Sequence, residues 1–310
     1  MKRRIPLILI TLSLMVAGML LYAALQELIG EFGESRPVSA GRVHEAALMN
    51  DLEALRREVQ AGVDLNAPDE GSGSRTSGLT PLMAAAFAGH QDGMRLLIDG
   101  GARADARGRE GRNALFYAAG WGGVGCVRML LEASPPARVD ARSDDGWTPT
   151  MMAASRGEYE ALRALLAAGA NVDAKNRWGE TALLLATEAQ SSEKVRALLG
   201  AGANVNEGDN TGRTPIAAAA ASGESAIELL ELLLASGADP NVEDRDGVTP
   251  LMRAASRGDP ARVILLLNAG ALADPRDEAG DRALDWARRR DDALGREVAD
   301  ILRLAPGGGS

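Results

Sequence analysis

Residues Gly146–Trp178 read GWTPTMMAASRGEYEALRALLAAGANVDAKNRW, and this stretch decides the fold. Thr148 and Pro149 suit the N-cap and the first position of a helix, and the small apolar residues after them give that helix an apolar face. Gly157 ends the first helix, and leucines at helical spacing predict a second one that ends near Gly169. One such helix–turn–helix unit cannot bury its apolar face alone, so it must stack on copies of itself.

The same pattern returns along the chain, and a glycine opens each unit. The intervals between these glycines are 33, 35, 33, 33, 35 and 33 residues, for Gly78, Gly111, Gly146, Gly179, Gly212, Gly247 and Gly280. We attribute the two longer intervals to Ser134-Pro135-Pro136 and to two extra residues in the helix AIELLELLL (226–234). GSGSRTS (71–77) adds about six residues to an earlier turn. Insertions of this kind fall in loops and leave the stacking intact.

The amino-acid sequences of the units resemble those of the ankyrin repeat family. The first halves are GLTPLMAAAFAGH (78–90), GWTPTMMAASRG (146–157), GRTPIAAAAASG (212–223) and GVTPLMRAASRG (247–258). The second halves are RALLAAGANVDAKN (163–176), RALLGAGANVNEGD (196–209) and ELLLASGADPNVED (231–244). The period and the phased copies carry the resemblance, which covers about residues 41–305. It implies an all-α ankyrin-repeat solenoid of helix–turn–helix units of about 33 residues with β-turn or hairpin tips.

On this resemblance the chain divides into an N-terminal cap at 41–70, repeats that start near 78, 111, 146, 179, 212 and 247, and a C-terminal cap from 280. Residues 306–310 form a flexible tail. In the C-cap, three arginines (288–290) replace small stacking residues, so we expect that face to meet water. The family often has a histidine after the TPL motif, and here other residues take its place: Met83, Phe116, Met151, Leu184, Ala217, Met252 and Asp285. We therefore expect stability to depend more on packing.

The first 25 residues are predicted to be a signal anchor or transmembrane helix. Lys2, Arg3 and Arg4 precede an uncharged, mostly apolar run from Ile5 to Leu25, which as a helix would be about 31 Å long, close to one hydrocarbon core. A cleaved signal peptide is the alternative, but no A-x-A site follows the run. The basic residues place the N-terminus in the cytoplasm and the repeats across the membrane. Residues 26–40 read as a linker.

Composition argues against several functions. The formal charge is −9, and without Lys2, Arg3 and Arg4 it is −9 − 3 = −12, so a nucleic-acid partner is not expected. A single cysteine, Cys126, excludes an intrachain disulfide, and its inward helical position predicts a buried, inert thiol. His44 and His90 fall in different units and predict no metal site. We expect His90 to be structural, in the turn between helices. No catalytic constellation and no cofactor site is recognisable.

The resemblance implies that protein partners bind the concave face, which turn tips and first helices form. Three of the four tryptophans map to this face on consecutive repeats, with arginines nearby, and such residues are typical of interface hot spots. Alternatively, each ring packs on a neighbouring turn and only stiffens it. Trp286 maps to the core of the C-cap. The candidate partner-binding residues are Trp121, Trp147, Trp178, Arg177, Arg112, Arg156, Phe87, Arg213 and Arg245.

These patterns favour a non-catalytic, monomeric protein-interaction scaffold with a protein partner. Many Arg, Ala and Gly with only three Lys indicate a GC-rich bacterium, so we expect display on the periplasmic side of the inner membrane. One alternative is an accessory factor for an envelope enzyme, such as one that handles oxidants, by analogy with bacterial envelope ankyrin proteins. Another is a soluble periplasmic or secreted binding protein left after signal cleavage.

Overall fold

The computed structural model describes residues 41–71, 73–223 and 226–306. The chain divides into Met1–Ser39 and Ala40–Ser310, and the described residues all belong to the second unit. The expected membrane helix (1–25), the linker (26–40) and residues 307–310 of the tail lie outside the described residues. Within the described ranges the regular structure is helical, apart from one isolated bridge between Asp69 and Ser77. The prediction of an all-helical solenoid is confirmed there.

The helices of the described residues fall into eight consecutive pairs. The first helices of the pairs are α2 (Gly41–Met49), α4 (Pro81–Ala88), α6 (Ala114–Tyr117) continued by the π-helical turn η3 (Ala118–Gly122), α8 (Pro149–Ser155), α10 (Ala182–Glu188), α12 (Pro215–Ala221), α14 (Pro250–Arg257) and α16 (Ala283–Arg288). The second helices are α3 (Leu52–Gln60), α5 (Gln91–Asp99), α7 (Gly123–Glu132), α9 (Tyr159–Ala167), α11 (Ser192–Gly200), α13 (Ala226–Ala235), α15 (Pro260–Asn268) and α17 (Ala293–Leu304). A short 3-10 turn, η2 (Arg109–Gly111), precedes α6.

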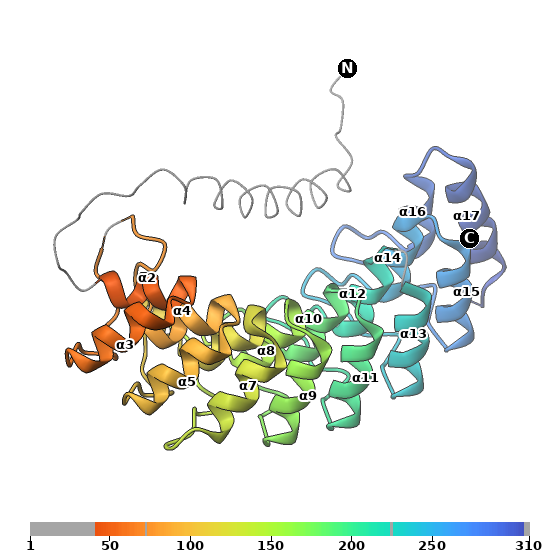
Figure 1. Ribbon diagram of the computed structural model, residues 1–310. Helices are drawn as coiled ribbons and strands as arrows, with labels where there is room; N and C mark the ends of the chain where they lie inside the picture. The colour runs from red at the N-terminus through yellow and green to blue at the C-terminus, as the bar shows by residue number, and fades with distance from the viewer. Residues whose placement is uncertain (1–40, 72, 224–225, 307–310) are drawn as a thin grey trace. The chain divides into compact units, whose positions relative to one another are not determined.

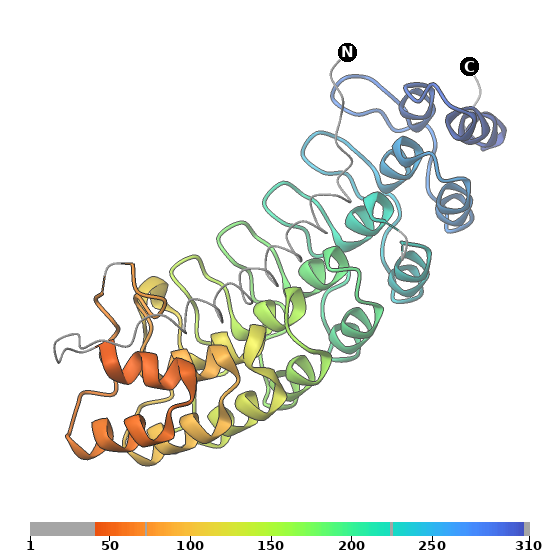
Figure 2. The same cartoon turned by 45° about the horizontal axis from the view of Figure 1, so that its top comes forward.

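The pairs stack in order, so that first helices pack on first helices and second helices on second helices. Figure 1 shows these two rows. Figure 2 shows a third row, the loops that project from the helices and join one pair to the next. The described part of the chain therefore has three kinds of surface: loop tips, first helices and second helices.

Threonine starts most of the first helices. The Oγ of Thr80, Thr148 and Thr249 accepts a hydrogen bond from the backbone N–H three residues later, at 3.2–3.3 Å. That N–H belongs to the residue at the position where the family often has histidine. Met83 also accepts a weak bond through its sulfur from the Thr80 N–H, at 3.4 Å. The threonines are thus held by helix capping in the absence of the histidine.

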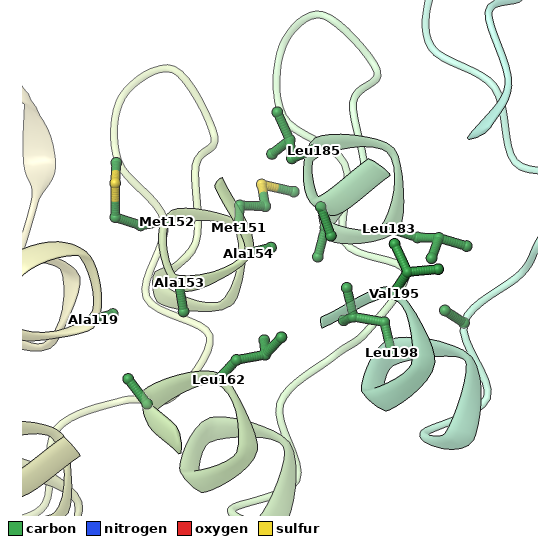
Figure 3. Packing of buried hydrophobic residues seen from close by; sticks show 14 of the residues in the cluster. Ala119, Met151, Met152, Ala153, Ala154, Leu162, Leu183, Leu185, Val195 and Leu198 are labelled. Atoms are coloured by element: carbon green, nitrogen blue, oxygen red, sulfur yellow. The ribbon is translucent and has the colours of Figure 1, made fainter. Parts of the chain in front are cut away.

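Small side chains let neighbouring pairs approach closely. Ala153 and Ala154 of α8 are fully buried, and Figure 3 shows them among methionine and leucine side chains of their own repeat and leucine side chains of the next. A Cβ on Gly157 would lie 2.0 Å from the carbonyl oxygen of Ala119 in the preceding repeat. The abundance of Ala and Gly in the sequence therefore follows from helix stacking at short distance.

The loop tips are joined by a ladder of backbone hydrogen bonds. In successive tips Asp144 N–H donates to Glu110, Arg177 N–H to Asp145, and Asn210 N–H to Trp178, at 2.8–2.9 Å. Inside most tips a polar side chain accepts backbone N–H groups, as Asn176 does from Trp178 and Glu180 at 3.0 Å. The glycine of each turn has a positive φ, such as +81° at Gly179, which favours a residue without Cβ.

Basic side chains close the C-terminal ends of several first helices. His90 Nε2 lies 3.1 Å from the carbonyl oxygen of Leu48 at the end of α2, and Lys194 donates to Ala154 in α8 at 3.2 Å. Arg262 donates to Ser222 after α12 at 2.6 Å. These contacts satisfy carbonyl groups that have no partner within the helix, and Lys194 and Arg262 also place positive charge at its negative end. The structural role expected for His90 is therefore confirmed.

One detail differs from the sequence predictions. The helix α13 is described from Ala226 to Ala235, and the two residues before it lie outside the described residues, so the place of its two-residue insertion stays a prediction. In the C-cap, Arg290 turns back toward the preceding pair and donates to the carbonyl oxygen of Ser256 at 3.2 Å, whereas Arg288 and Arg289 are exposed. The expectation that all three arginines face water is therefore wrong for Arg290, because it closes the end of α14.

Within the described residues one helical run, Ala114–Glu132, is long and apolar enough to cross a membrane by length and composition alone. It comprises α6, η3 and α7, and 56% of it is buried inside the array. That burial is expected of a helix pair in the core of a repeat.

Candidate functional site

Three aromatic side chains from the second and third helix pairs form one cluster, which we call the aromatic patch: Phe87, Tyr117 and Trp121. The ring centroids of Phe87 and Trp121 are 5.3 Å apart, and each lies 6.2–6.3 Å from that of Tyr117. Phe87 is 40% exposed and Trp121 is 44% exposed, whereas Tyr117 is nearly buried beneath them. The first helices thus present two large apolar rings to solvent on a buried aromatic base.

Glycines on both sides of Trp121 set its position. A Cβ on Gly122 would lie 2.2 Å from the carbonyl oxygen of Ala86 in α4, and one on Gly120 would lie 2.8 Å from Met152 in α8. The helix η3 therefore packs tightly between its neighbours, which brings the Trp121 ring to Phe87. The π-helical turn occurs here, and such turns are frequent at functional sites.

Arg112 lies beside the aromatic patch at the tip of the same repeat. Its guanidinium carbon is 4.9 Å from the centre of the Phe116 ring, and its Nη2 is 2.7 Å from Glu110. Burial raises the pKa of Tyr117, and hydrogen bonding and charge from Arg112 oppose that rise. Arg112 is thereby fixed next to the patch by aromatic and ionic contacts on both sides.

A second exposed cluster lies at the tips of the next two repeats. Trp178 is 43% exposed, and the guanidinium of Arg177 lies 4.6 Å from the centre of its ring. Arg177 also forms an ion pair with Asp145 of the preceding tip. The pair is therefore a rigid cation–π contact, stiffened by a bridge between repeats.

The three tryptophans do not form the continuous exposed strip that their sequence positions predict. Trp147 is half-buried and packs against the core, and its backbone N–H donates to Ser143. Trp121 makes its ring contacts with Phe87 and Tyr117. For Trp147 the alternative, in which the ring stiffens a turn, describes the structure better, because its repeat folds the ring onto the apolar core.

The remaining candidate residues are dispersed. Arg213 forms ion pairs with Glu188 and, at 3.5 Å, with Asp209, so its charge is largely neutralised. Arg156, at the end of α8, and Arg245, at a loop tip, are exposed. The structure thus brings together Phe87 and Trp121, with Arg112 beside them, and Arg177 with Trp178, and leaves the other candidates apart. Sequence reasoning missed Tyr117, whose only signal was its place four residues before Trp121 on a helix.

Other residues that the sequence analysis singled out have structural surroundings. Cys126 is fully buried, and burial raises its pKa to about 11, so the thiol stays protonated. This confirms the expected burial of Cys126. His44 Nε2 is 2.9 Å from the carbonyl oxygen of Ala67. In the part of the chain that the structure describes, no group of three or more His, Cys, Asp or Glu side chains could hold a metal ion. Trp286 donates to Asp277 at 2.8 Å in the C-cap, as a structural residue would.

Comparisons with known proteins agree with this architecture. The family described as "Ankyrin repeats (3 copies)" matches residues 43–142, 110–176, 150–244 and 216–305. The chain is 35% identical over 126 residues to Protein glp-1 of Caenorhabditis elegans, a match that covers 37% of this chain and 9% of that protein. The chain thus spans a small part of that relative's length.

A solved structure, the ankyrin repeat domain of Bcl-3, a member of the IkappaB protein family, superposes with a TM-score of 0.60 at 30% identity. The match covers 76% of this chain and 99% of the other. Since the overlapping family matches run without a gap from residue 43 to residue 305, this chain belongs to the ankyrin repeat family.

Proposed function

We propose that this protein is a non-catalytic scaffold that binds a partner protein through the aromatic patch on its first helices. Ankyrin repeats are protein-interaction modules, and the patch gives this general role a location on the chain. The Arg177–Trp178 pair is a second contact point for the same partner.

The exposure of Phe87 and Trp121 carries the proposal. Phe87 and Trp121 each leave about two fifths of their surface exposed to water, although Tyr117 directly beside them is nearly buried. Large aromatic side chains on a rigid base lose little conformational entropy on binding and dominate interface energetics. Arg112 beside them adds a donor group of the kind that recurs at interface hot spots.

The test is affinity capture by the full chain, followed by mass spectrometry of what co-purifies, with three forms compared. The wild type is set against Phe87→Ala/Trp121→Ala and against Ile264→Ala. Ile264 is an ideal control because it is 44% exposed but lies on α15, a second helix. We expect the double variant to lose the partner and Ile264→Ala to retain it.

Truncation of one hot-spot aromatic costs about 2 kcal/mol or more of binding free energy, or about thirtyfold in Kd. Thermal unfolding of all three forms must show the same transition, so that loss of binding is not loss of fold. Retention of the partner by the double variant would contradict the proposal.

We also propose that residues 5–25 anchor the protein in a membrane, with the repeats on the periplasmic side. The support is the sequence alone: an uncharged apolar run preceded by Lys2, Arg3 and Arg4. Alkaline phosphatase fused after Ser310 should be active in a bacterial host, and the chain should resist carbonate extraction from membranes. A mature N-terminus beyond residue 20 would show a cleaved signal peptide instead and refute the anchor.

A further inference from the structure

A groove of about 560 Å³ lies among the loops that follow the second helices α5 and α7. We call it the arginine groove. Its lining residues are Asn66, Arg103, Asp105, Ala106, Arg107, Asn113, Arg138, Asp140, Ala141 and Arg142. Four arginines and two aspartates give the lining a charge of +4 − 2 = +2, in a chain of net charge −9.

The other repeats show that these arginines are not required by the fold. Arg103 and Arg138 take the position that Asn171, Asn204 and Asp239 occupy later in the chain. Arg107 and Arg142 take the position that is Lys175, Gly208 and Glu243 in those repeats. Only the repeats that line the groove have arginine at both positions, so the basic charge is concentrated at this place.

Structural contacts account for part of the arginine set. Arg107 donates to the carbonyl oxygen of Arg142 at 2.7 Å, and Arg142 donates to that of Lys175, so both guanidinium groups tie one repeat to the next. Arg103 pairs with Asp105 at 3.2 Å and is 64% exposed. Among the described residues, the Arg138 side chain makes no hydrogen bond or ion pair. Arg138 and the Nη1 group of Arg103, which does not contact Asp105, are thus the groups available to a ligand.

Asn113 provides an independent indication of a ligand. It is 2% exposed, it lines the groove, and its Nδ2 has no hydrogen-bond partner. Its Oδ1 caps α6 by accepting from Phe116 N–H at 3.0 Å, so the side chain is held in place. In the neighbouring repeats a threonine caps the first helix instead, and its side chain has no N–H group. An unpaired buried donor is costly, and an acceptor oxygen bound in the groove would relieve it.

We propose that the arginine groove binds an acidic peptide segment of a protein, with one carboxylate held by Arg103 and another by Arg138. Guanidinium groups match carboxylates in a planar, paired geometry. None of these residues belongs to the aromatic patch, so the groove is a separate site. A partner could occupy both.

The charge distribution favours a peptide over a nucleic acid or another polyphosphate. Asp105 and Asp140 stand in the wall of the groove, and the whole chain carries a formal charge of −9. A long polyanion would meet this negative field, and nucleic-acid binding needs a basic surface. A short peptide with a few carboxylates meets only the local positive charge.

The spacing of the repeats defines the peptide. Equivalent positions on neighbouring stacked helices are about 10 Å apart, and a peptide in the polyproline II conformation advances about 3.1 Å per residue and has three residues per turn, so every third side chain lies on the same face. Arg103 and Arg138 hold equivalent positions on adjacent repeats, so they fit carboxylates about three residues apart. The probe is therefore a fluorescein-labelled peptide that repeats Glu-Ser-Ser, and the matched control repeats Gln-Ser-Ser.

Binding is measured by fluorescence anisotropy with the full chain. We expect the glutamate peptide to bind and the glutamine peptide not to bind. Arg103→Gln/Arg138→Gln should weaken binding at least about tenfold, because two charge-assisted contacts are lost. Arg163→Gln/Arg196→Gln is the control of equal charge change, on exposed arginines of the second helices α9 and α11, and should change Kd by less than about twofold.

Asn113→Thr tests the donor without a change in charge. Threonine should keep the cap of α6 and the thermal stability while peptide binding weakens, because Nδ2 is lost.

Equal loss of binding in the groove variant and in the Arg163/Arg196 control would show non-specific attraction and overturn the proposal. Displacement of the peptide by inorganic phosphate at equal concentration would show a general anion site and overturn the assignment to peptide. Neither of these outcomes bears on the proposed role of the aromatic patch, because the test of the patch uses the captured partner protein and different variants.

Discussion

Cys126 illustrates how the stacking decides the chemistry of a residue. It lies on α7, faces the array and is fully buried, with no charged group that could stabilise a thiolate. Burial raises its pKa to about 11 because the charged form would lose its hydration. A thiol that stays protonated at neutral pH is a poor nucleophile and a poor metal ligand.

We therefore expect Cys126 to resist alkylation by iodoacetamide at pH 8 in the folded protein. With a pKa of about 11, roughly one thiol in a thousand is ionised at that pH. The same reagent should label it to completion in denaturant. Mass spectrometry of both samples gives the answer, and full labelling of the folded protein would show that the thiol is accessible.

Two threonines test how much helix capping contributes to stability, because Thr214 can serve as the control for Thr148. Thr148 accepts from Met151 N–H at 3.2 Å, whereas Thr214 makes no cap bond and its Oγ1 has no partner. Thr148→Ala should lower the free energy of unfolding by about 1 kcal/mol, and Thr214→Ala should cost clearly less. Urea unfolding measures both, and equal losses would contradict the assigned role of the cap.

At the scale of the element, η3 shows what a π-helical turn does in this chain. Gly122 approaches the carbonyl oxygen of Ala86, and this contact places Trp121 beside Phe87. Any side chain at position 122 would push η3 away from α4. The aromatic patch therefore depends on a residue that is not part of it.

Gly122→Ala should destabilise the protein by about 1–3 kcal/mol, because the new Cβ would lie 2.2 Å from a backbone oxygen. Gly200→Ala is the matched control: this glycine is also helical, and its Cβ would meet nothing within 4 Å. It should stabilise the protein by about 0.5–1 kcal/mol. Urea denaturation reports both free energies. Opposite signs support the close packing of η3, and a neutral Gly122→Ala would refute it.

The sequence predicts the elements well because the period, the TP pairs and the glycines are local signals. Thr148, Pro149 and Gly157 place a helix without knowledge of its neighbours. The aromatic patch is different, since Phe87 and Trp121 lie 34 residues apart and meet only through the short approach at Gly122. Trp147 is half-buried for a similar reason, as its ring folds onto a core that the sequence pattern does not locate.

At the scale of the whole molecule, each repeat depends on its neighbours through backbone and side-chain ladders. Tip joins tip through backbone hydrogen bonds such as Arg245 N–H to Thr211, and Asn204 N–H donates to Asp173 of the preceding repeat. Several carboxylates in these contacts have altered pKa values. For Asp209 and Asp277, burial raises the pKa but hydrogen bonds to the charged form outweigh it, so the net shift is downward.

These shifts predict a loss of stability in acid. A carboxyl group whose pKa is lower in the folded state contributes stability above its unfolded pKa, near 3.8 for Asp, and loses it as pH falls further. Asp69, Asp209, Asp277 and Asp292 act in this direction. Burial raises the pKa of Glu188, so this residue acts in the opposite direction. Urea unfolding between pH 7 and pH 3 should show falling stability, and a rise on acidification would contradict it.

The central claim is that a partner protein binds the first-helix surface at the aromatic patch. Hydrogen–deuterium exchange of the full chain, with and without the captured partner, tests it most directly. We predict slower exchange on binding in α4 and in the segment from α6 to η3, with α9, α11 and α15 unchanged. Protection confined to the second helices, with α4 and η3 unaffected, would contradict the claim.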